Sequence, residues 1–450
     1  MQKKLMWKMV TVFGLCLLAM IPLTLVQRVI NERQALRDDV IRGFESQTVG
    51  PQILKGPVLA VPYRKLVIET TREDRGGKIV DVPHRKVVTG SLYFLPETVD
   101  VEGRAVPQIR KRGIYRAQAY SGDWVVKGRF ELPADFGVGA DRAQYTWSTP
   151  EIHFGITDPR GLAPGIAMRW DGVVAVMQPG SGLAGLGRGI HAPVDIDKPG
   201  MGKAQSVDFE MQLGLTGLNR IQFLPTGRSS EVRLSSTWPH PGFFGPLLAN
   251  HRIDANGFRA TWKTSYLANN LLQEYTDCFE RSHCDGFSAA AFGVDLIEPV
   301  NLYQQLERCA KYGLLFVGLT FIAFFLFDVL KQCPIHPVQY ALVGGALVIF
   351  YLLLTSLAEH VEFGLAYLIA AGACIALIGY YIAHVLGSWQ RGTLVGAMLA
   401  LLYGVLFLIL QSEDNALLMG SILLFAFVAA VMIGTRKVDW YGLGSPVAAS

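Results

Sequence analysis

The sequence predicts a polytopic α-helical membrane protein with six transmembrane helices and one large inserted all-β domain of antiparallel, sandwich-like character. Two observations support this fold class. Residues 312–434 contain five apolar runs, and a sixth lies near the N-terminus. Residues 50–311 contain many short segments of strand-like composition separated by Gly, Pro, Asp and Asn. A hydrocarbon core roughly 30 Å thick requires about 20 helical residues, which is close to the length of each apolar run.

The composition is that of a membrane protein with a substantial polar part. Of 450 residues, 51% are hydrophobic and 17% are charged, and the net charge is +4. So small a net charge does not indicate a nucleic-acid partner, and we expect none. Because the apolar residues are concentrated in the C-terminal part, the lipid bilayer is the expected partner of that part.

Residues 1–8 form a short basic segment before an apolar run at residues 9–26. The basic residues are Lys3, Lys4 and Lys8. The run is longer than that of a cleaved signal peptide, and no cleavage site of the small-x-small type follows it. We interpret residues 1–8 as a cytoplasmic N-terminus and residues 9–26 as an uncleaved transmembrane signal anchor. A cleaved signal peptide is the alternative.

Residues 27–49 continue with apolar residues at roughly helical spacing, among them Val29, Ala35 and Val40. This pattern predicts an amphipathic extension helix that ends before Gly50-Pro51. Its apolar side requires a partner. The β domain is the first candidate, and a second subunit in a homo-oligomer is the other.

Residues 50–311 are predicted to form the β-rich domain. Residues 206–213 read SVDFEMQL, in which apolar and polar residues alternate. Such alternation indicates a strand with one buried and one solvated face. Many such segments with turn residues between them favour antiparallel sheets packed as a sandwich.

Cys278 and Cys284 lie close together within this domain, in the phrase DCFERSHCDGF. A disulfide is the favoured interpretation, and its short loop predicts a modest gain in stability. Free thiols are an alternative. A zinc site that uses His283 is a third, although a fourth ligand at a recognised spacing is missing.

The five C-terminal runs occupy residues 312–330, 338–357, 363–383, 392–412 and 416–434, and a tail at residues 435–450 follows. Four of them contain no Asp, Glu, Lys or Arg, and the first contains only Asp328. They predict a five-helix transmembrane domain at residues 312–434.

The charges in the short loops predict the orientation. Lys and Arg occur in loops 331–337 and 388–391 and in the tail, whereas loops 358–362 and 413–415 carry only acidic charges. Since Lys and Arg are enriched on the cytoplasmic side, both termini and residues 435–450 are expected in the cytoplasm. Residues 27–311 are then expected on the opposite side of the membrane.

Glu359, His360 and Glu362 form the densest group of ionisable residues near a predicted membrane boundary. Carboxylates beside an imidazole can relay protons or hold a cation there. A solvated acidic loop that follows the orientation rule explains the same residues, so both interpretations remain open.

Small residues recur at steps of four in the fifth predicted helix, as Gly392, Gly396, Ala400 and Gly404. Such a stripe allows two helix backbones to approach closely. We expect it to mark a helix contact inside the bundle, with oligomerisation as the alternative.

Sequence motifs of common enzymes are missing. No G-x-S-x-G, H-E-x-x-H or paired Cys-x-x-Cys is present, and the phrase GLAGLGRG at residues 182–189 lacks the Lys-Ser/Thr of a phosphate-binding loop. We interpret that phrase as a flexible loop, and His153, His191, His240 and His251 as loop and surface residues. No catalytic residue, metal site or cofactor is therefore expected, although enzyme activity is left open.

Several longer phrases carry a family resemblance. They are GPVLAVPY, SSTWPHPGF, FGVDLIEPVNLYQQLERCAKYGLLFVGLTFIAFFLF, HPVQYALVGGALVIFYLLLTSLAEH and FAFVAAVMIGTRKVDWYGL. The chain resembles the CreD family of Gram-negative inner-membrane proteins, also called cell envelope integrity proteins. It departs from the family pattern after Pro241, where GFFGPLL stands in place of a phrase ending near Phe-Leu-Pro, and at Ala358, where Ser is expected.

The resemblance implies an inner-membrane location, a periplasmic domain, and a role in envelope homeostasis under a two-component regulator that responds to envelope or antibiotic stress. It implies no catalytic residue. The leading hypothesis is a non-enzymatic protein whose periplasmic β domain binds an envelope protein, glycan or lipid. A transporter or channel with Glu359, His360 and Glu362 at its periplasmic mouth is the second hypothesis, weakened by the shortage of ionisable residues within the spans. A membrane-bound envelope lipid or glycan enzyme is the third.

Overall fold

The computed structural model describes residues 2–74, 79–113, 115–196, 203–265, 274–275, 278–279, 284–297, 302–331, 336–412 and 416–436. The chain forms two compact units. Met1–Asp39 and Val300–Ser450 make up the helical unit, and Val40–Pro299 make up the β unit. The boundary between them at Asp39 falls inside the first helix, so that helix is shared by both units.

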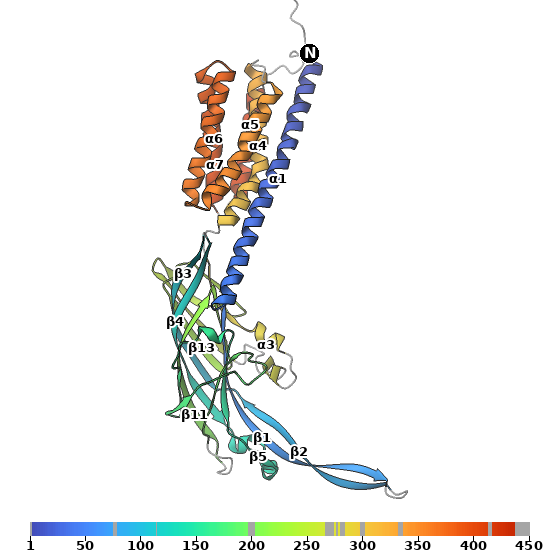
Figure 1. Ribbon diagram of the computed structural model, residues 1–450, viewed down its shortest axis with the longest axis vertical. Coiled ribbons are helices and arrows are strands. Elements are labelled where there is room, and N and C mark those ends of the chain that lie inside the picture. Colours follow the sequence, from blue (N-terminus) through green and yellow to red (C-terminus); the bar gives the residue numbers. More distant parts are fainter. Residues whose placement is uncertain are drawn as a thin grey trace, which may run out of the picture. The chain divides into compact units, whose positions relative to one another are not determined.

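The helical unit is built from long apolar helices (Figure 1). They are α1 (Gln2–Gln47), α4 (Leu302–Lys331), α5 (Pro337–Ala358), α6 (Phe363–Val385), α7 (Trp389–Gln411) and α8 (Ala416–Thr435). Within the described residues, six helices are long and apolar enough to cross a membrane. The six predicted spans are therefore confirmed.

Two helices extend beyond the predicted ranges. α1 begins at Gln2, before residue 9, and continues through the predicted span at residues 9–26 and nearly all of the extension predicted at residues 27–49. α4 begins at Leu302, before residue 312, since the polar stretch that precedes the apolar run is itself helical. The charged residues near this start, such as Arg308 and Lys311, thus lie on a helix and not in a loop.

The β unit contains two sheets. The first has the strand order β14-β17-β12-β1-β6-β10-β9, with β2 and β5 paired to β1, and the second has the order β15-β16-β13-β3-β4-β11-β7-β8. The strands are β1 (Gln52–Asp74), β2 (Ile79–Phe94), β3 (Thr98–Arg112), β4 (Tyr115–Leu132), β5 (Tyr145–Trp147), β6 (Glu151–Ile156), β7 (Ala167–Trp170), β8 (Val173–Val176), β9 (Gln178–Pro179), β10 (Gly189–Pro193), β11 (Gln205–Leu218), β12 (Arg220–Pro225), β13 (Ser229–Ser236), β14 (Pro241–Phe244), β15 (Asn250–Asp254), β16 (Gly257–Ser265) and β17 (Phe292–Leu296).

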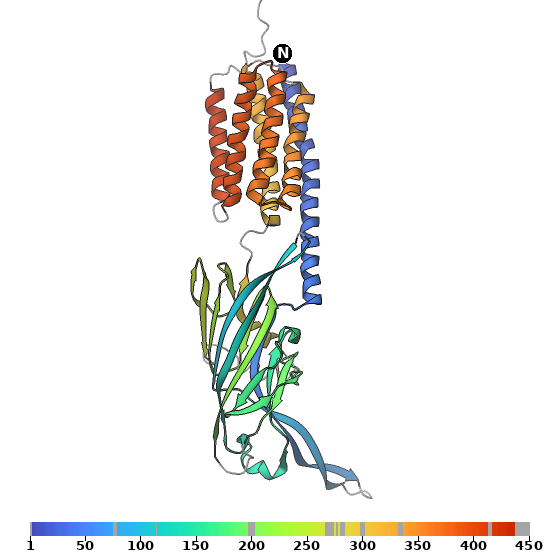
Figure 2. The same ribbon diagram turned by 60° about the vertical axis from the view of Figure 1, so that its left-hand side comes forward.

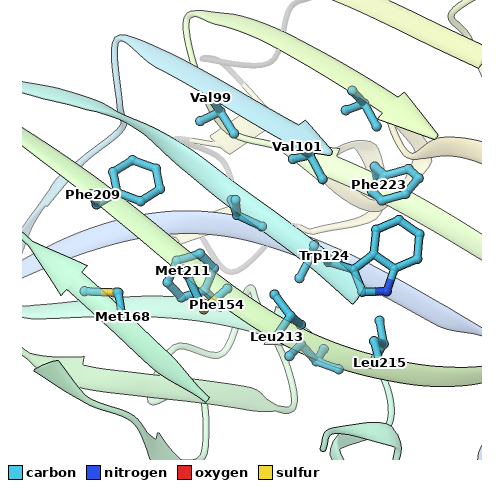
Figure 3. Close-up of a cluster of buried hydrophobic side chains, with 14 of the residues drawn as sticks. Val99, Val101, Trp124, Phe154, Met168, Phe209, Met211, Leu213, Leu215 and Phe223 are labelled. Atoms are coloured by element: carbon cyan, nitrogen blue, oxygen red, sulfur yellow. The ribbon is translucent and has the colours of Figure 1, made fainter. Parts of the chain in front are cut away.

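A hydrophobic core fills the space between the two sheets (Figure 3). The predicted alternation in β11 is present, because Val207 and Phe209 are buried while Ser206 and Asp208 are exposed. The aromatic ring of Trp124 on β4 lies 5.6 Å from that of Phe223 on β12, which joins the second sheet to the first. This contact between sheets confirms a sandwich-like fold.

The sheets are mixed, not purely antiparallel. β1 pairs with β12 in parallel, as does β3 with β13, whereas the other strand pairs among the described residues are antiparallel. Each parallel pair joins segments far apart in the sequence, so the alternation of single strands could not reveal it. β1 and β2 form a long hairpin whose far end is exposed on both faces (Figures 1 and 2).

The C-terminus of α1 is held to the β unit by Arg160. Its Nη1 donates to the carbonyl of Ser46 at 2.8 Å, and its Nη2 donates to that of Glu45 at 3.1 Å. The same guanidinium donates to both carboxylate oxygens of Asp158, at 2.8 and 2.6 Å. A cation at the C-terminus of a helix also interacts favourably with the helix dipole. The hydrogen bonds from Arg160 hold the pKa of the Asp158 carboxyl below its usual range.

We expect Arg160→Gln to lower the thermal midpoint of the β unit, because the charge-assisted hydrogen bonds to Asp158, Ser46 and Glu45 are lost. Thermal unfolding of the detergent-solubilised protein measures this. Arg259→Gln, at an exposed position on β16, is the control and should be nearly neutral. Since the pKa of Asp158 is lowered in the folded state, its contribution is complete above its unfolded pKa of about 4 and is lost as the pH falls through the lowered value. Equal losses in both variants, or a difference that persists in strong acid, would contradict this role.

Candidate functional site

Two histidines lie opposite each other on the face of the first sheet that points away from the sandwich core. His153 on β6 and His191 on β10 are direct cross-strand partners. Glu151 lies two residues before His153, so its side chain is on the same face of the sheet. Val58 on β1 is the cross-strand neighbour on the other side of His153. The sheet register therefore creates a cluster of two imidazoles and a carboxylate.

Both imidazoles are hydrogen-bonded to the glycine-rich loop, which we define as residues 179–189. His153 Nδ1 lies 2.5 Å from the carbonyl oxygen of Ser181, and His191 Nδ1 lies 2.7 Å from that of Gly180. Since a carbonyl only accepts, each Nδ1 carries the proton. The two rings stack with their centroids 5.8 Å apart. The histidine pair thus fixes the start of the glycine-rich loop against the sheet.

Burial keeps His153 neutral. Its side chain is only 3% exposed, and its Nε2 lies 3.7 Å from a carboxylate oxygen of Glu151, which is too far for a hydrogen bond. Burial lowers the pKa of His153, and the neighbouring His191 adds to this effect, whereas the Ser181 carbonyl and Glu151 oppose it. The hydrogen bond to Ser181 requires a proton on Nδ1, and burial favours the neutral tautomer that carries this proton.

The glycine-rich loop is packed on its other side by the segment that contains the disulfide. Cys278 and Cys284 are joined, with an S–S distance of 2.05 Å. A Cβ atom added at Gly185 would lie 2.6 Å from Cys278 Sγ, so only glycine fits between the loop and this segment. Gly182 has φ of +69° beside the ring of His153, a conformation that favours glycine. Apolar residues complete the contact, namely Val58, Leu186, Leu224, Tyr275, Phe287 and Ala291.

An open cavity of about 810 Å³ lies beside the glycine-rich loop. Its walls are mainly apolar and include Leu162, Ile166, Val176 and Ile190. Arg188 is the one charged residue among the described residues that line it. The cavity can therefore take an apolar group together with a negative charge, and the histidine pair and disulfide segment hold its loop wall in place.

The cluster behind the loop does not have the geometry of a metal centre. Among the described residues, no group of three or more His, Cys, Asp or Glu side chains is placed to hold a metal ion. The Nδ1 atoms of His153 and His191 are also engaged by loop carbonyls. The arrangement supports the loop by hydrogen bonding, and His240 and His251 lie on other strands or loops away from it.

The structure places Glu359, His360 and Glu362 in different environments. The Glu359 side chain is 9% exposed, accepts a hydrogen bond from Tyr303 at 3.3 Å, and lies 3.7 Å from Nε of Arg33 on α1. His360 and Glu362 are exposed in the turn between α5 and α6. The three side chains do not converge, because α5 ends at Ala358 and the turn directs only Glu359 into the bundle. Glu359 thus connects α1, α4 and α5.

The small-residue stripe on α7 divides into two parts. A Cβ added at Gly392 would lie 2.4 Å from Cβ of Ala383 on α6, so this position allows close packing of α6 and α7. A Cβ added at Gly379 on α6 would lie 3.8 Å from Cα of Gly396, so these two glycines face each other. Ala400 and Gly404 are exposed. Helix packing within the described bundle therefore uses Gly392 and Gly396.

Sequence reasoning missed the histidine pair and the cavity. His153 is buried on a strand and is not a loop or surface residue, and the glycine-rich loop is packed, since Leu186 is only 2% exposed. The phrases EIHFGIT and GIHAP each have strand-like composition, which was the available signal. Their pairing could not be read from either phrase, because β6 and β10 are separated by three short strands of both sheets.

Comparison with known proteins gives a match over nearly the whole chain. A family model described as "Inner membrane protein CreD" matches residues 4–441. The inner membrane protein CreD of Escherichia coli (strain K12) is 36% identical over 448 residues, which are 99% of this chain and 96% of that protein. The match includes both the helical unit and the β unit.

We expect Glu359→Ala to lower the free energy of unfolding of the helical unit by about 1–2 kcal/mol, because Tyr303 loses an acceptor and Arg33 loses its ion-pair partner. Glu362→Ala removes an exposed carboxylate from the same turn and should change stability by less than about 0.5 kcal/mol. Thermal loss of helical circular dichroism in detergent compares the two. Equal behaviour of the two variants would show that Glu359 has no special role in the bundle.

The β unit should lose stability in mild acid through His153. The pKa of His153 is lowered in the folded state, whereas in the unfolded chain it is about 6.5. As the pH falls below that value, the unfolded chain binds more protons than the folded chain, so the free energy of unfolding decreases. His153→Gln should reduce the shift in thermal midpoint between about pH 7.5 and about pH 5.5. His251→Gln, at an exposed position, should leave that shift unchanged. A pH dependence that is the same in all three proteins is the contrary result.

Proposed function

Because the chain belongs to the CreD family of inner membrane proteins, we propose that it supports cell-envelope integrity by binding an envelope component through its β unit. The binding site in this proposal is the cavity of about 810 Å³ beside the glycine-rich loop. This cavity is the observation that carries the proposal. It has the size and the mainly apolar walls that are typical of ligand sites.

The distribution of charge supports a periplasmic location for the β unit. The protein is an inner membrane protein of a Gram-negative bacterium. If the six helices cross the membrane one after another, the helix ends that carry Lys8, Arg391 and Arg436 lie on one side of it. The turn that carries Glu359 and Glu362 then lies on the other side. In this proposal the basic ends and both termini are cytoplasmic. The β unit, within residues 27–311, is then periplasmic, where envelope components are accessible.

The chemistry of the cavity favours binding without reaction. Its described lining contains no carboxylate, thiol or imidazole that could act as a nucleophile or general base. Ser181 Oγ is within hydrogen-bonding distance of the carbonyls of Leu183 and Gly187, so this hydroxyl is engaged in the loop. The features that remain are an apolar surface and the guanidinium of Arg188.

A transport function has less support. It required Glu359, His360 and Glu362 to surround one mouth, and only Glu359 points inward. The cavity of about 380 Å³ among α4, α7 and α8 is lined by apolar side chains such as Phe324, Leu394 and Phe427. Such a lining suits packing or lipid, whereas a solute path requires polar groups.

Filling the cavity tests the proposed function. Val176 lies on the cavity wall and is 75% exposed, so Val176→Trp should block the cavity without disturbing the core. Val173→Trp is the matched control, because Val173 is on the same strand, is 71% exposed and points to the other face. In a strain made detergent-sensitive by loss of the native protein, the control should restore resistance and Val176→Trp should not. Equal restoration by both variants, at equal protein levels, would refute the site.

A further inference from the structure

One sheet edge of the β unit differs from the others. Four strands end the two strand orders, β14 and β9 in the first sheet and β15 and β8 in the second, and β2 and β5 are further edge strands, because each pairs only with β1 among the described residues. β2 carries Asp81, Arg85 and Lys86, and β5 is only three residues long. β14 begins with Pro241, β9 is only two residues long and ends with Pro179, and β15 carries Arg252 and Asp254. Proline, charge and short length are devices that prevent an edge from pairing with another chain. β8 has the sequence VVAV and lacks proline and charge.

β8 has backbone groups on its outer side that no described strand pairs with, and β10 passes close to the strand. Within the described residues β8 pairs only with β7. The two strands are joined by Asp171 and Gly172, whose φ values of 46° and 79° define a two-residue hairpin turn. Val173 flanks this turn and is hydrogen-bonded to β7, so in an antiparallel ladder the N–H and C=O groups of Val174 and Val176 point outward. An extended backbone could pair with them.

The free edge leads to the cavity beside the glycine-rich loop. Val174 and Val176 share one face of β8, and they are 62% and 75% exposed. Val176 and the following Met177 both line the cavity. A β8 strand from a second copy would offer only valine and alanine side chains, which are too small to fill about 810 Å³. The cavity size therefore favours a partner with a larger apolar side chain.

The charge of the cavity specifies a further property of the ligand. Arg188 is exposed, has no ion-pair partner among the described residues, and is the one charged residue of the described lining. Charge complementarity therefore favours a ligand that carries a negative group together with an apolar side chain. In an extended polypeptide, a carboxylate and a side chain occur on the same residue only at the C-terminus or in Asp and Glu, and only a C-terminal residue combines the carboxylate with an apolar side chain.

We propose that this edge and cavity bind the free C-terminus of an extended polypeptide. The backbone adds to β8 as a further strand, the apolar C-terminal side chain enters the cavity, and the terminal carboxylate pairs with Arg188. Strand addition with a side-chain pocket and capture of a C-terminal carboxylate are both established modes of peptide recognition. The inference rests on the proposed function, and it specifies the partner as a protein with an apolar C-terminal residue.

Peptide binding to the full-length protein in detergent tests the inference. Fluorescent peptides of about ten residues, with alternating Thr and Val, end in Val, Leu, Ile or Phe and carry either a free carboxylate or an amide. Fluorescence anisotropy measures their affinity. At least one free acid should bind, and its amide should bind about tenfold more weakly, because the charge-assisted pair is lost.

Variants with matched controls separate the contribution of the β8 backbone to peptide binding from that of the Arg188 cation. Val174→Pro removes one outward N–H, and Arg188→Gln removes the cation, so each should weaken binding of the free acid about tenfold. Ile253→Pro changes an outward-facing position on β15, and Arg252→Gln removes an exposed cation from the same strand; both should bind as the unsubstituted protein does. Thermal unfolding of each variant shows whether it is folded.

Several results would overturn the inference. One is that none of the free acids binds, and another is that acid and amide bind equally. Tight binding of dodecanoate that is insensitive to Val174→Pro would assign the cavity to an anionic amphiphile. Self-association that Val174→Pro abolishes would assign the edge to a second copy. If Val176→Trp abolishes complementation while no peptide binds, the proposed function stands and the polypeptide inference fails.

Discussion

Each backbone N–H and C=O group within the hydrocarbon of a bilayer must have its hydrogen-bond partner inside the protein. The helical unit meets this requirement and the β unit does not. α1, α4, α5, α6, α7 and α8 satisfy it by bonds within each helix. The two sheets of the β unit cannot, because β8 and β15 each pair on one side only among the described strands. We therefore expect the β unit to lie in water, and the edge of β8 that would be costly in the bilayer is also the feature by which we infer that the unit binds a partner.

The cavity beside that edge is held open by contacts on both sides of the glycine-rich loop. His153 and His191 fix the loop carbonyls from the sheet side, and the disulfide segment packs against Gly185 from the other. A site whose walls are fixed before binding loses less conformational entropy when a ligand enters. The buried histidine, which has no metal or catalytic geometry among the described residues, is thus explained by its position under the loop.

The sequence predicted those features that depend on neighbouring residues. Run length located the six spans, and alternation identified the buried face of β11, with Val207 and Phe209 inward. Features that join distant segments were not predicted, such as the parallel pairing of β1 with β12 and the opposition of His153 and His191. Closeness in the sequence wrongly suggested one cluster at residues 359–362, because the Glu359 side chain points into the bundle while His360 and Glu362 are exposed. On α7, the four-residue spacing of small residues predicted that they share one face. It did not predict that the end of this face at Gly392 is the part that packs against α6.

Site-specific photo-crosslinking in living cells can show whether the cavity and the β8 edge bind an envelope protein. A compact aliphatic diazirine residue at position 176, close to valine in size, lies on the cavity wall without filling it, and one at position 253 lies on the opposite edge of the same sheet. We expect a discrete adduct with a periplasmic or envelope protein from position 176 whose yield falls strongly when Arg188→Gln is present in the same chain. No such adduct is expected from position 253. The absence of any adduct from position 176, or one that is unchanged by Arg188→Gln, would contradict the account.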